Sequence, residues 1–326
     1  MKARLKPRRR SRLAPLLVGK SSPTASLYFE NACQGWLLDG KIKKIASTVF
    51  ASETTQLVFR HDAGVPAGFS RPRTVYFMDD YWHPDQNLPW QYRQKTKFLE
   101  HRAARFYMQS ADWVGVSSDV LHAQLQQEYP HKPTGVLHPF WSEPLADLDH
   151  FNHPALDICF LGARSHASDL TLILPAIRAV LHQFPKAEFT LSQTHRLPAD
   201  LAVHKRVNRM PQMGWQDYRK WVVKQRFHVA LYPLKKGPFN AARSTSKMTE
   251  HAIVGAACLC SAHWKNGADR SIPVGDNPAD WVQKLCWIAA DRGVAKHMAQ
   301  VNKTVASQQN HPETQQAVWQ DLLFPK

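Results

Sequence analysis

The segment GPFNAARSTSKMTEHAIVGAACLCS, from Gly237 to Ser261, holds side chains whose types and spacing could do chemistry. Two cations, Arg243 and Lys247, stand four positions apart where an apolar-periodic helix is expected to begin. Helix N-termini favour negative charge, and two cations at this spacing repel each other. An anion bound between them would remove both penalties, because the first backbone N–H groups of a helix are free donors.

The expected helix runs from Arg243 to Val254 and ends at Gly255. It places Arg243, Lys247 and Glu250 on one stripe. We interpret its start as a cradle for a diphosphate, with Glu250 one turn further on to accept hydrogen bonds from a ribose diol. The alternative, a solvated helix face with a Lys247–Glu250 ion pair, stays open at this point.

The composition indicates a globular protein that attracts anions. The chain has 326 residues, which suits two domains, with 44% hydrophobic and 21% charged residues. It carries 42 Lys and Arg against 26 Asp and Glu, a net charge of +16, and its first residues, MKARLKPRRRSRL, contain no acid. Nucleotides, nucleic acid and acidic lipid headgroups are the partners that such a charge favours.

Short apolar strands alternate with helices in both halves, separated by a linker with prolines and acids at 142–154. This alternation predicts an α/β protein of two Rossmann-like, doubly wound domains that face a cleft. The expected divisions are a basic, flexible tail at 1–23, a first α/β domain at 24–150 and a second at 151–326. The last helical piece, PETQQAVWQDLL, could return to the first domain.

The second half resembles glycosyltransferases of the GT-B fold, especially the family 4-like enzymes (glycosyl transferases group 1). Those enzymes have a pattern much like F-N-x-x-R-S-x-x-K-x-x-E-x-x-x-x-G, which this chain carries from Phe239 to Gly255. The stretch FLGARSHASDLTLILPAI resembles the strand, glycine turn and helix that open the same domain, and ADWVGVSSDVLHAQL resembles the end of the first domain. These stretches cover a little under half of the chain, and the first hundred residues match nothing specifically.

The resemblance implies that the second domain holds a nucleotide-diphosphate sugar and that the first binds a glycan or lipid-linked acceptor. It implies that Lys247 and Arg243 meet the diphosphate and assist its departure, and that Glu250 holds the ribose. The implied donor-binding residues are Gly162, Arg164, Asn240, Arg243, Ser244, Lys247 and Glu250.

One position departs from the family pattern. Many retaining members have two glutamates in this motif, and the first falls at Ala242 here, with Asn240 as the nearest polar substitute. Retaining and inverting chemistry therefore both stay open, as does a GT-B scaffold without catalytic activity. Inverting chemistry needs a base for the acceptor hydroxyl, and Asp80, His61 and Asp62 are the candidates.

Other functional classes find less support in the sequence. Asp79 and Asp80, with His83 near them, could hold a metal, but GT-B enzymes generally need none, so we expect no metal and no cofactor. The P-loop, G-x-S-x-G and H-E-x-x-H motifs are absent. The net charge and the basic-aromatic stretch WQYRQKTKFLEHRAARFY leave a nucleic-acid-binding protein as an alternative, although no nucleic-acid module is recognisable.

The expected location is the cytoplasm, with attachment to the inner face of the membrane as an extension. The five cysteines are scattered and are interpreted as reduced thiols. The apolar run after the basic start, LAPLLVG, is too short for a signal peptide or a membrane span. With the resemblance, these features predict a hexosyltransferase-type enzyme of polysaccharide biosynthesis that docks on anionic lipid.

Overall fold

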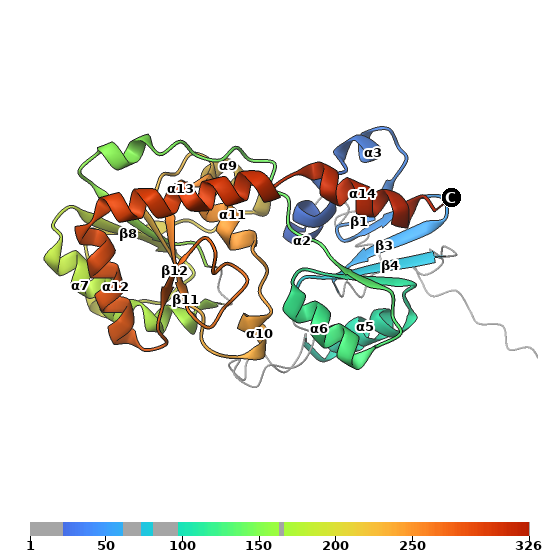
Figure 1. Ribbon diagram of the computed structural model, residues 1–326, viewed down its shortest axis with the longest axis horizontal. Coiled ribbons are helices and arrows are strands. Elements are labelled where there is room, and N and C mark those ends of the chain that lie inside the picture. Colours follow the sequence, from blue (N-terminus) through green and yellow to red (C-terminus); the bar gives the residue numbers. More distant parts are fainter. Residues whose placement is uncertain (1–21, 61–72, 81–96, 163–165, 326) are drawn as a thin grey trace, which may run out of the picture.

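The computed structural model describes residues 22–60, 73–80, 97–162 and 166–325. Within these ranges each half of the chain forms one six-stranded sheet with helices packed around it (Figure 1). The predicted α/β class with two sheets is confirmed.

The first sheet has its strands in sequence order, β1-β2-β3-β4-β5-β6. The pairs from β3 to β6 are parallel, as expected for an α/β domain, whereas β1 and β2 form an antiparallel hairpin on its edge. The sequence analysis did not predict this hairpin, whose strands are short. The strand bounds are β1 Lys43–Ala46, β2 Val49–Ala51, β3 Thr55–Phe59, β4 Arg73–Met78, β5 Trp113–Val116 and β6 Thr134–Val136.

The second sheet is parallel throughout and has the order β12-β11-β10-β7-β8-β9. Strand order reverses between β7 and β10, which are neighbours in the sheet but far apart in sequence. Open α/β sheets bind ligands in the crevice outside the carboxyl ends of the strands at such a reversal. The strand bounds are β7 Leu156–Phe160, β8 Ala187–Ser192, β9 Val207–Met210, β10 Val229–Tyr232, β11 Ala257–Ser261 and β12 Ile272–Val274.

Helices connect and cover both sheets. In the first half they are α2 Pro23–Ala25, η1 Ser26–Glu30, α3 Gln34–Leu38, α5 Lys97–Ser110 and α6 Asp119–Glu128. In the second half they are η2 Asp149–Asn152, η4 Asp169–Leu172, α7 Leu174–Gln183, α8 Ala199–Ala202, α9 Trp215–Val222, α10 Pro238–Ala241, α11 Ser246–Ile253, α12 Pro278–Ala290, α13 Arg292–Gln309 and α14 Pro312–Leu323.

The helix that carries Lys247 begins later than the sequence predicts. α11 starts at Ser246, and Arg243 lies in the non-helical turn between α10 and α11. The prediction that Arg243, Lys247 and Glu250 share one helical stripe is therefore wrong for Arg243. The end of the helix is confirmed, because Gly255 follows the C-cap with a φ of 73°, which favours glycine.

Side chains from elsewhere explain the late helix start. A helix beginning at Arg243 would use the carbonyls of Ala242 and Arg243 as acceptors for its own N–H groups. Instead, Ser118 of the first half donates to the Ala242 carbonyl at 2.8 Å. Trp264 Nε1 and Asn266 Nδ2 donate to the Arg243 carbonyl at 3.1 and 2.7 Å. These partners hold the turn open and carry Arg243 toward the first sheet.

The last two helices connect the halves. Figure 1 shows α13 along the second half and α14 over the first, beside α2 and α3. Trp319 of α14 is fully buried, makes edge-on ring contacts with Phe29 and Phe59, and donates from Nε1 to the Tyr28 carbonyl at 2.7 Å. Burial of a side chain of this size contributes on the order of 3 kcal/mol, so α14 is part of the first core.

A shared apolar interface and one asparagine fix the crossing between the halves. One hydrophobic cluster contains Phe77 and Trp319 together with Leu161 and Ile253 of the second half. At the crossing, Trp141 N donates to Asn310 Oδ1 at 2.8 Å, and Asn310 Nδ2 donates to the Trp141 carbonyl at 2.6 Å. The two chain segments that pass between the halves are thus hydrogen-bonded to each other.

Candidate functional site

A pocket of about 680 Å³ opens at the carboxyl end of β7, where the strand order of the second sheet reverses. We call it the β7 pocket. Its lining combines backbone near β7, the Lys247–Glu250 face of α11, part of α9 and one residue of the first half. The lining residues are Pro23, Leu161, Gly162, Ser192, Thr194, Met210, Pro211, Gln212, Met213, Trp215, Tyr218, Lys247 and Glu250.

Lys247 and Glu250 form the charged part of this pocket. Lys247 Nζ pairs with the Glu250 carboxylate and donates to the Leu161 carbonyl at 2.8 Å. Tyr218 donates its hydroxyl proton to the other Glu250 oxygen. The ion pair of the alternative interpretation is therefore formed, but Glu250 is only 2% exposed, so this is a pocket wall and not a solvated helix face.

Gly162 brings bare backbone to the pocket. A Cβ at this position would lie 2.5 Å from the Phe160 ring, a contact that packed side chains do not make. The Gly162 carbonyl is held by His195, whose Nε2 lies 2.8 Å away. The chain after β7 is thus fixed, and glycine at position 162 leaves room for the Phe160 ring.

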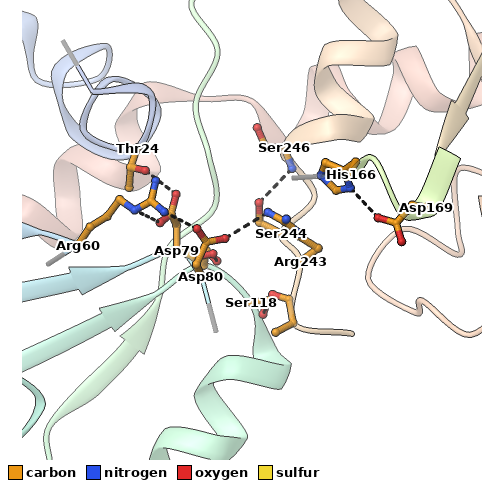
Figure 2. A network of polar contacts seen from close by, with 12 residues as sticks. Thr24, Arg60, Asp79, Asp80, Ser118, His166, Asp169, Arg243, Ser244 and Ser246 are labelled. Carbon is orange, nitrogen blue, oxygen red and sulfur yellow. Dashed lines mark hydrogen bonds and ion pairs between the residues drawn. The ribbon is translucent and has the colours of Figure 1, made fainter. Parts of the chain in front are cut away.

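Arg243 lies at the junction with the first half and outside the lining of the β7 pocket (Figure 2). Its Nη1 is 3.2 Å from Asp80 Oδ1, at the end of β4. Arg60 contacts both neighbouring acids, since it pairs with Asp80 and its Nε is 3.3 Å from Asp79 Oδ1. Arg243 also stacks on Phe239, with 4.1 Å from Cζ to the ring centre, and its buried Nε and Nη2 have no hydrogen-bond partner among the residues that the structure describes.

Asn240 has a different environment from the one that the sequence predicts for a donor ligand. It is 8% exposed and does not line the β7 pocket. Its side-chain amide donates to Asp169 Oδ1 at 3.1 Å and to the Lys235 carbonyl at 2.9 Å. These bonds join the loop after β10 to η4, and a donor-binding role for Asn240 stays a prediction.

The sequence analysis missed His166, which lies beside the candidate cations. Its Nδ1 is 3.0 Å from Asp169 Oδ2, and Figure 2 shows its ring near Arg243 and Ser246. Burial, and then the positive charge of Arg243, lower the pKa of His166 to about 4, although the hydrogen bond to Asp169 acts in the opposite direction. A neutral histidine therefore lies among the cations. Its i,i+3 spacing to Asp169 was the available sequence signal.

The remaining predicted residues are placed as follows. Ser244 lies in the turn before α11, where its Oγ is 3.4 Å from the Ser246 N–H. His61, Asp62 and Arg164 lie outside the described residues. Tyr218 of α9 was also missed in the sequence. The available signal was Glu250, three residues after Lys247 on α11, because a buried acid needs a hydrogen-bond donor such as Tyr218. The roles assigned to all of these side chains stay predictions.

Three solved structures share the architecture of this chain. TarM of S. aureus, in complex with fondaparinux, alpha-GlcNAc-glycerol and UDP, matches with a TM-score of 0.57 and 10% identity over 77% of this chain and 51% of its own. Sucrose-phosphate synthase of Thermosynechococcus elongatus gives 0.54 and 14% over 78% and 68%. Anabaena HepE, in complex with UDP and glucose, gives 0.53 and 12% over 78% and 72%.

The chain has the GT-B fold. It spans about half the length of TarM, 51%, and identities of 10–14% show the fold alone. No protein-family profile matches the sequence. A search of curated proteins likewise finds no relative. In this GT-B chain the β7 pocket belongs to the second sheet and meets the first half at Pro23.

Among the residues that the structure describes, no group of three or more His, Cys, Asp or Glu side chains is arranged to hold a metal ion. No helix there is both long and apolar enough to cross a membrane.

Proposed function

We propose that this chain is a glycosyltransferase that moves a sugar from a nucleotide-diphosphate donor to a glycan or lipid-linked acceptor. The observation that carries the proposal is the β7 pocket, where Lys247, Glu250 and the bare backbone at Gly162 converge at the strand-order reversal. A crevice at this point of an α/β sheet is where a nucleotide is expected. The resemblance of the sequence motif to family 4-like enzymes and the GT-B fold point to the same chemistry.

The pocket lining supports one orientation of the donor. Met210, Met213 and Trp215 form an apolar wall that suits a nucleobase, and Ser192 and Thr194 offer hydroxyl groups beside it. Glu250 would then accept from the ribose hydroxyls, and Lys247 would meet the diphosphate. UDP-containing structures of TarM and HepE make uridine nucleotides the first to test.

Stabilisation of the departing diphosphate is the chemical step that these residues serve. Lys247, in the first turn of α11, supplies a cation for this step. Arg243 would contribute its Nε and Nη2, which have no hydrogen-bond partner within the described ranges, when the diphosphate extends toward the junction of the halves. Ser244, beside it, would add a hydroxyl donor. No metal is needed for this arrangement.

The first half would present the acceptor. Asp80 lies two residues after β4, at the junction and against Arg243, so its carboxylate could take the proton of an acceptor hydroxyl. The net charge of +16 would favour docking on an anionic membrane surface that carries a lipid-linked acceptor of polysaccharide biosynthesis.

Lys247→Ala tests the assignment. We expect the variant to lose transfer, or donor hydrolysis, by about two to three orders of magnitude with UDP-sugars, because a charge contact to the leaving group is removed. GDP- and ADP-sugars are assayed in parallel. Lys296→Ala, which changes an exposed lysine of α13, is the matched control and should retain full activity.

The same pair of variants separates the alternatives. If wild type and Lys247→Ala turn over every donor equally, the proposed role of Lys247 is wrong. If the wild type binds UDP through Lys247 but transfers and hydrolyses no sugar, the chain is a GT-B scaffold without catalytic activity. UDP binding is measured by calorimetry, which does not depend on turnover.

A further inference from the structure

A second, smaller cavity of about 110 Å³ lies between the two halves, away from the β7 pocket. We call it the Arg270 cavity. The first half lines it with the start of α6, at Ser118 and Asp119, and the second half with Thr245, Asn266 and Arg270. A water molecule occupies about 30 Å³ of liquid volume, so the space suits a few waters or one small oxyanion.

Arg270 is the unusual member of this lining. It is only 1% exposed, and its Nε and Nη1 have no hydrogen-bond partner among the described residues. Burial lowers the pKa of Arg270, but a guanidinium remains charged at neutral pH. The charge of Asp269 opposes this effect of burial on the pKa, but enclosed guanidinium nitrogens without hydrogen-bond partners are costly, and a bound anion would supply those partners.

The other lining groups are compatible with an anion. α6 is a ten-residue helix with Ser118 as its N-cap, so the positive end of its dipole faces the cavity. Thr245 adds a hydroxyl group. Two acids, Asp119 and Asp269, also line the cavity, but both are exposed, and water screens their charge more than that of the enclosed Arg270.

The cavity is also connected to the turn that carries Arg243. Ser118 donates to the Ala242 carbonyl and Asn266 to the Arg243 carbonyl, and both side chains line the cavity. Thr245 is the N-cap of α11, two residues before Lys247. A ligand held here would contact both halves and fix the position of this turn.

We propose that the Arg270 cavity is a binding site for a small oxyanion, a phosphate or carboxylate group, separate from the nucleotide pocket. Arg270 holds the anion by charge and the start of α6 holds it by its N–H groups. The source is either a free anion or the acidic group of a sugar, and the binding itself does not depend on the proposed transfer reaction.

The test is thermal unfolding of the full chain with inorganic phosphate, acetate or glucuronate, each against sodium chloride at equal ionic strength. We expect at least one anion to raise the Tm of the wild type by a few degrees, increasing with the logarithm of its concentration. Arg270→Met should abolish this increase, and Arg270→Lys should keep part of it. Lys247→Ala should keep all of it, because the nucleotide pocket is elsewhere.

Stability without added anion controls for folding. Arg270→Met should unfold at the same or a higher Tm than the wild type in chloride, because it removes an unpartnered buried charge. Phosphate or acetate acting alone would indicate a free anion, and glucuronate acting more strongly would indicate the acidic group of a sugar. An absent shift with all three anions, or one that persists in Arg270→Met, would overturn the proposal.

Discussion

At the scale of single residues, burial shifts the pKa of His251 more than neighbouring charges do. His251 of α11 is 1% exposed, and its Nδ1 has no hydrogen-bond partner in the described part of the chain. Burial, and then the charge of Lys247, lower the pKa of His251 to about 3. The unfolded chain binds a proton near pH 6.5 and the folded chain does not, so stability is full above pH 6.5 and falls as the pH drops toward 3.

This linkage predicts the effect of removing the histidine. When the pH falls from 7.5 to 5, the neutral state of His251 should lower the unfolding free energy of the wild type by about 2 kcal/mol. His251→Asn should not show this part of the decrease. Urea unfolding at the two pH values measures it. His297→Asn, at an exposed site on α13, should leave the pH dependence unchanged. An equal slope in all three proteins would contradict the buried, neutral state of His251.

Gly162 makes a second prediction at the residue scale. A Cβ there meets the Phe160 ring at 2.5 Å, so Gly162→Ala must shift the buried Phe160 ring or the backbone that lines the β7 pocket. We expect UDP affinity to fall about tenfold or more, or about 1.4 kcal/mol, as measured by calorimetry. Gly35→Ala is the matched control, since nothing lies within 4 Å of its added Cβ. Unchanged UDP binding in Gly162→Ala would place the nucleotide elsewhere.

At the scale of elements, the N-cap residue of one helix also joins the two halves of the chain. Ser118 caps α6 by accepting from the Leu121 N–H, and it donates to the Ala242 carbonyl across the junction. Asn277 caps α12 in the same way, accepting from the Asp280 N–H within the second half alone. Both residues therefore cap a helix, but only Ser118 also joins the two halves.

Substitution of both caps separates these roles. Ser118→Ala and Asn277→Ala should each destabilise the protein by about 1 kcal/mol, measured by urea unfolding. Only Ser118→Ala should also weaken UDP binding, because it releases the turn that carries Arg243. Equal UDP affinity in the two variants would mean that the turn keeps its position without the Ser118 bond.

At the scale of the whole molecule, Arg243 and Asp80 form an ion pair between the halves. Both side chains are about one-fifth exposed, 19% and 22%, so the pair is less screened than a surface pair. If the diphosphate binds Arg243 in place of Asp80, UDP should reduce the coupling energy between Arg243 and Asp80. A double-mutant cycle with Asp80→Asn and Arg243→Gln, measured by unfolding with and without UDP, gives that energy.

The expected coupling is about 1 kcal/mol without UDP and near zero at saturating UDP. Arg178 and Asp200 provide the control cycle, because this pair lies within the second half and is exposed on both sides. Its coupling should not respond to UDP. A coupling between Asp80 and Arg243 that UDP leaves intact would exclude Arg243 from the diphosphate.

Much of the fold was predictable because its signals are local. The alternation of apolar strands and helices was enough to predict the α/β class. The glycine at position 255 indicated the end of α11, and its positive φ confirms that end. Lys247 and Glu250 were predicted to share a helix face, and they do, since α11 spans both. Periodicity, capping and glycine conformation depend on neighbours within a few residues, so one sequence is enough to infer them.

The tertiary structure alone decided what depends on distant partners. Arg243 lies outside α11. Ser118, Trp264 and Asn266 donate to the Ala242 and Arg243 carbonyls, which a longer helix would use as acceptors. The neutral state of His166 and the enclosure of Arg270 depend on burial, which segments remote in sequence create. The amino-acid order by itself therefore determined the α/β class, the end of α11 and the charged motif, but neither the β1–β2 hairpin nor the start of α11. Which carbonyls, cations and cavities come together was decided by packing between the two halves, since hydrogen bonding and desolvation act through space and not along the chain.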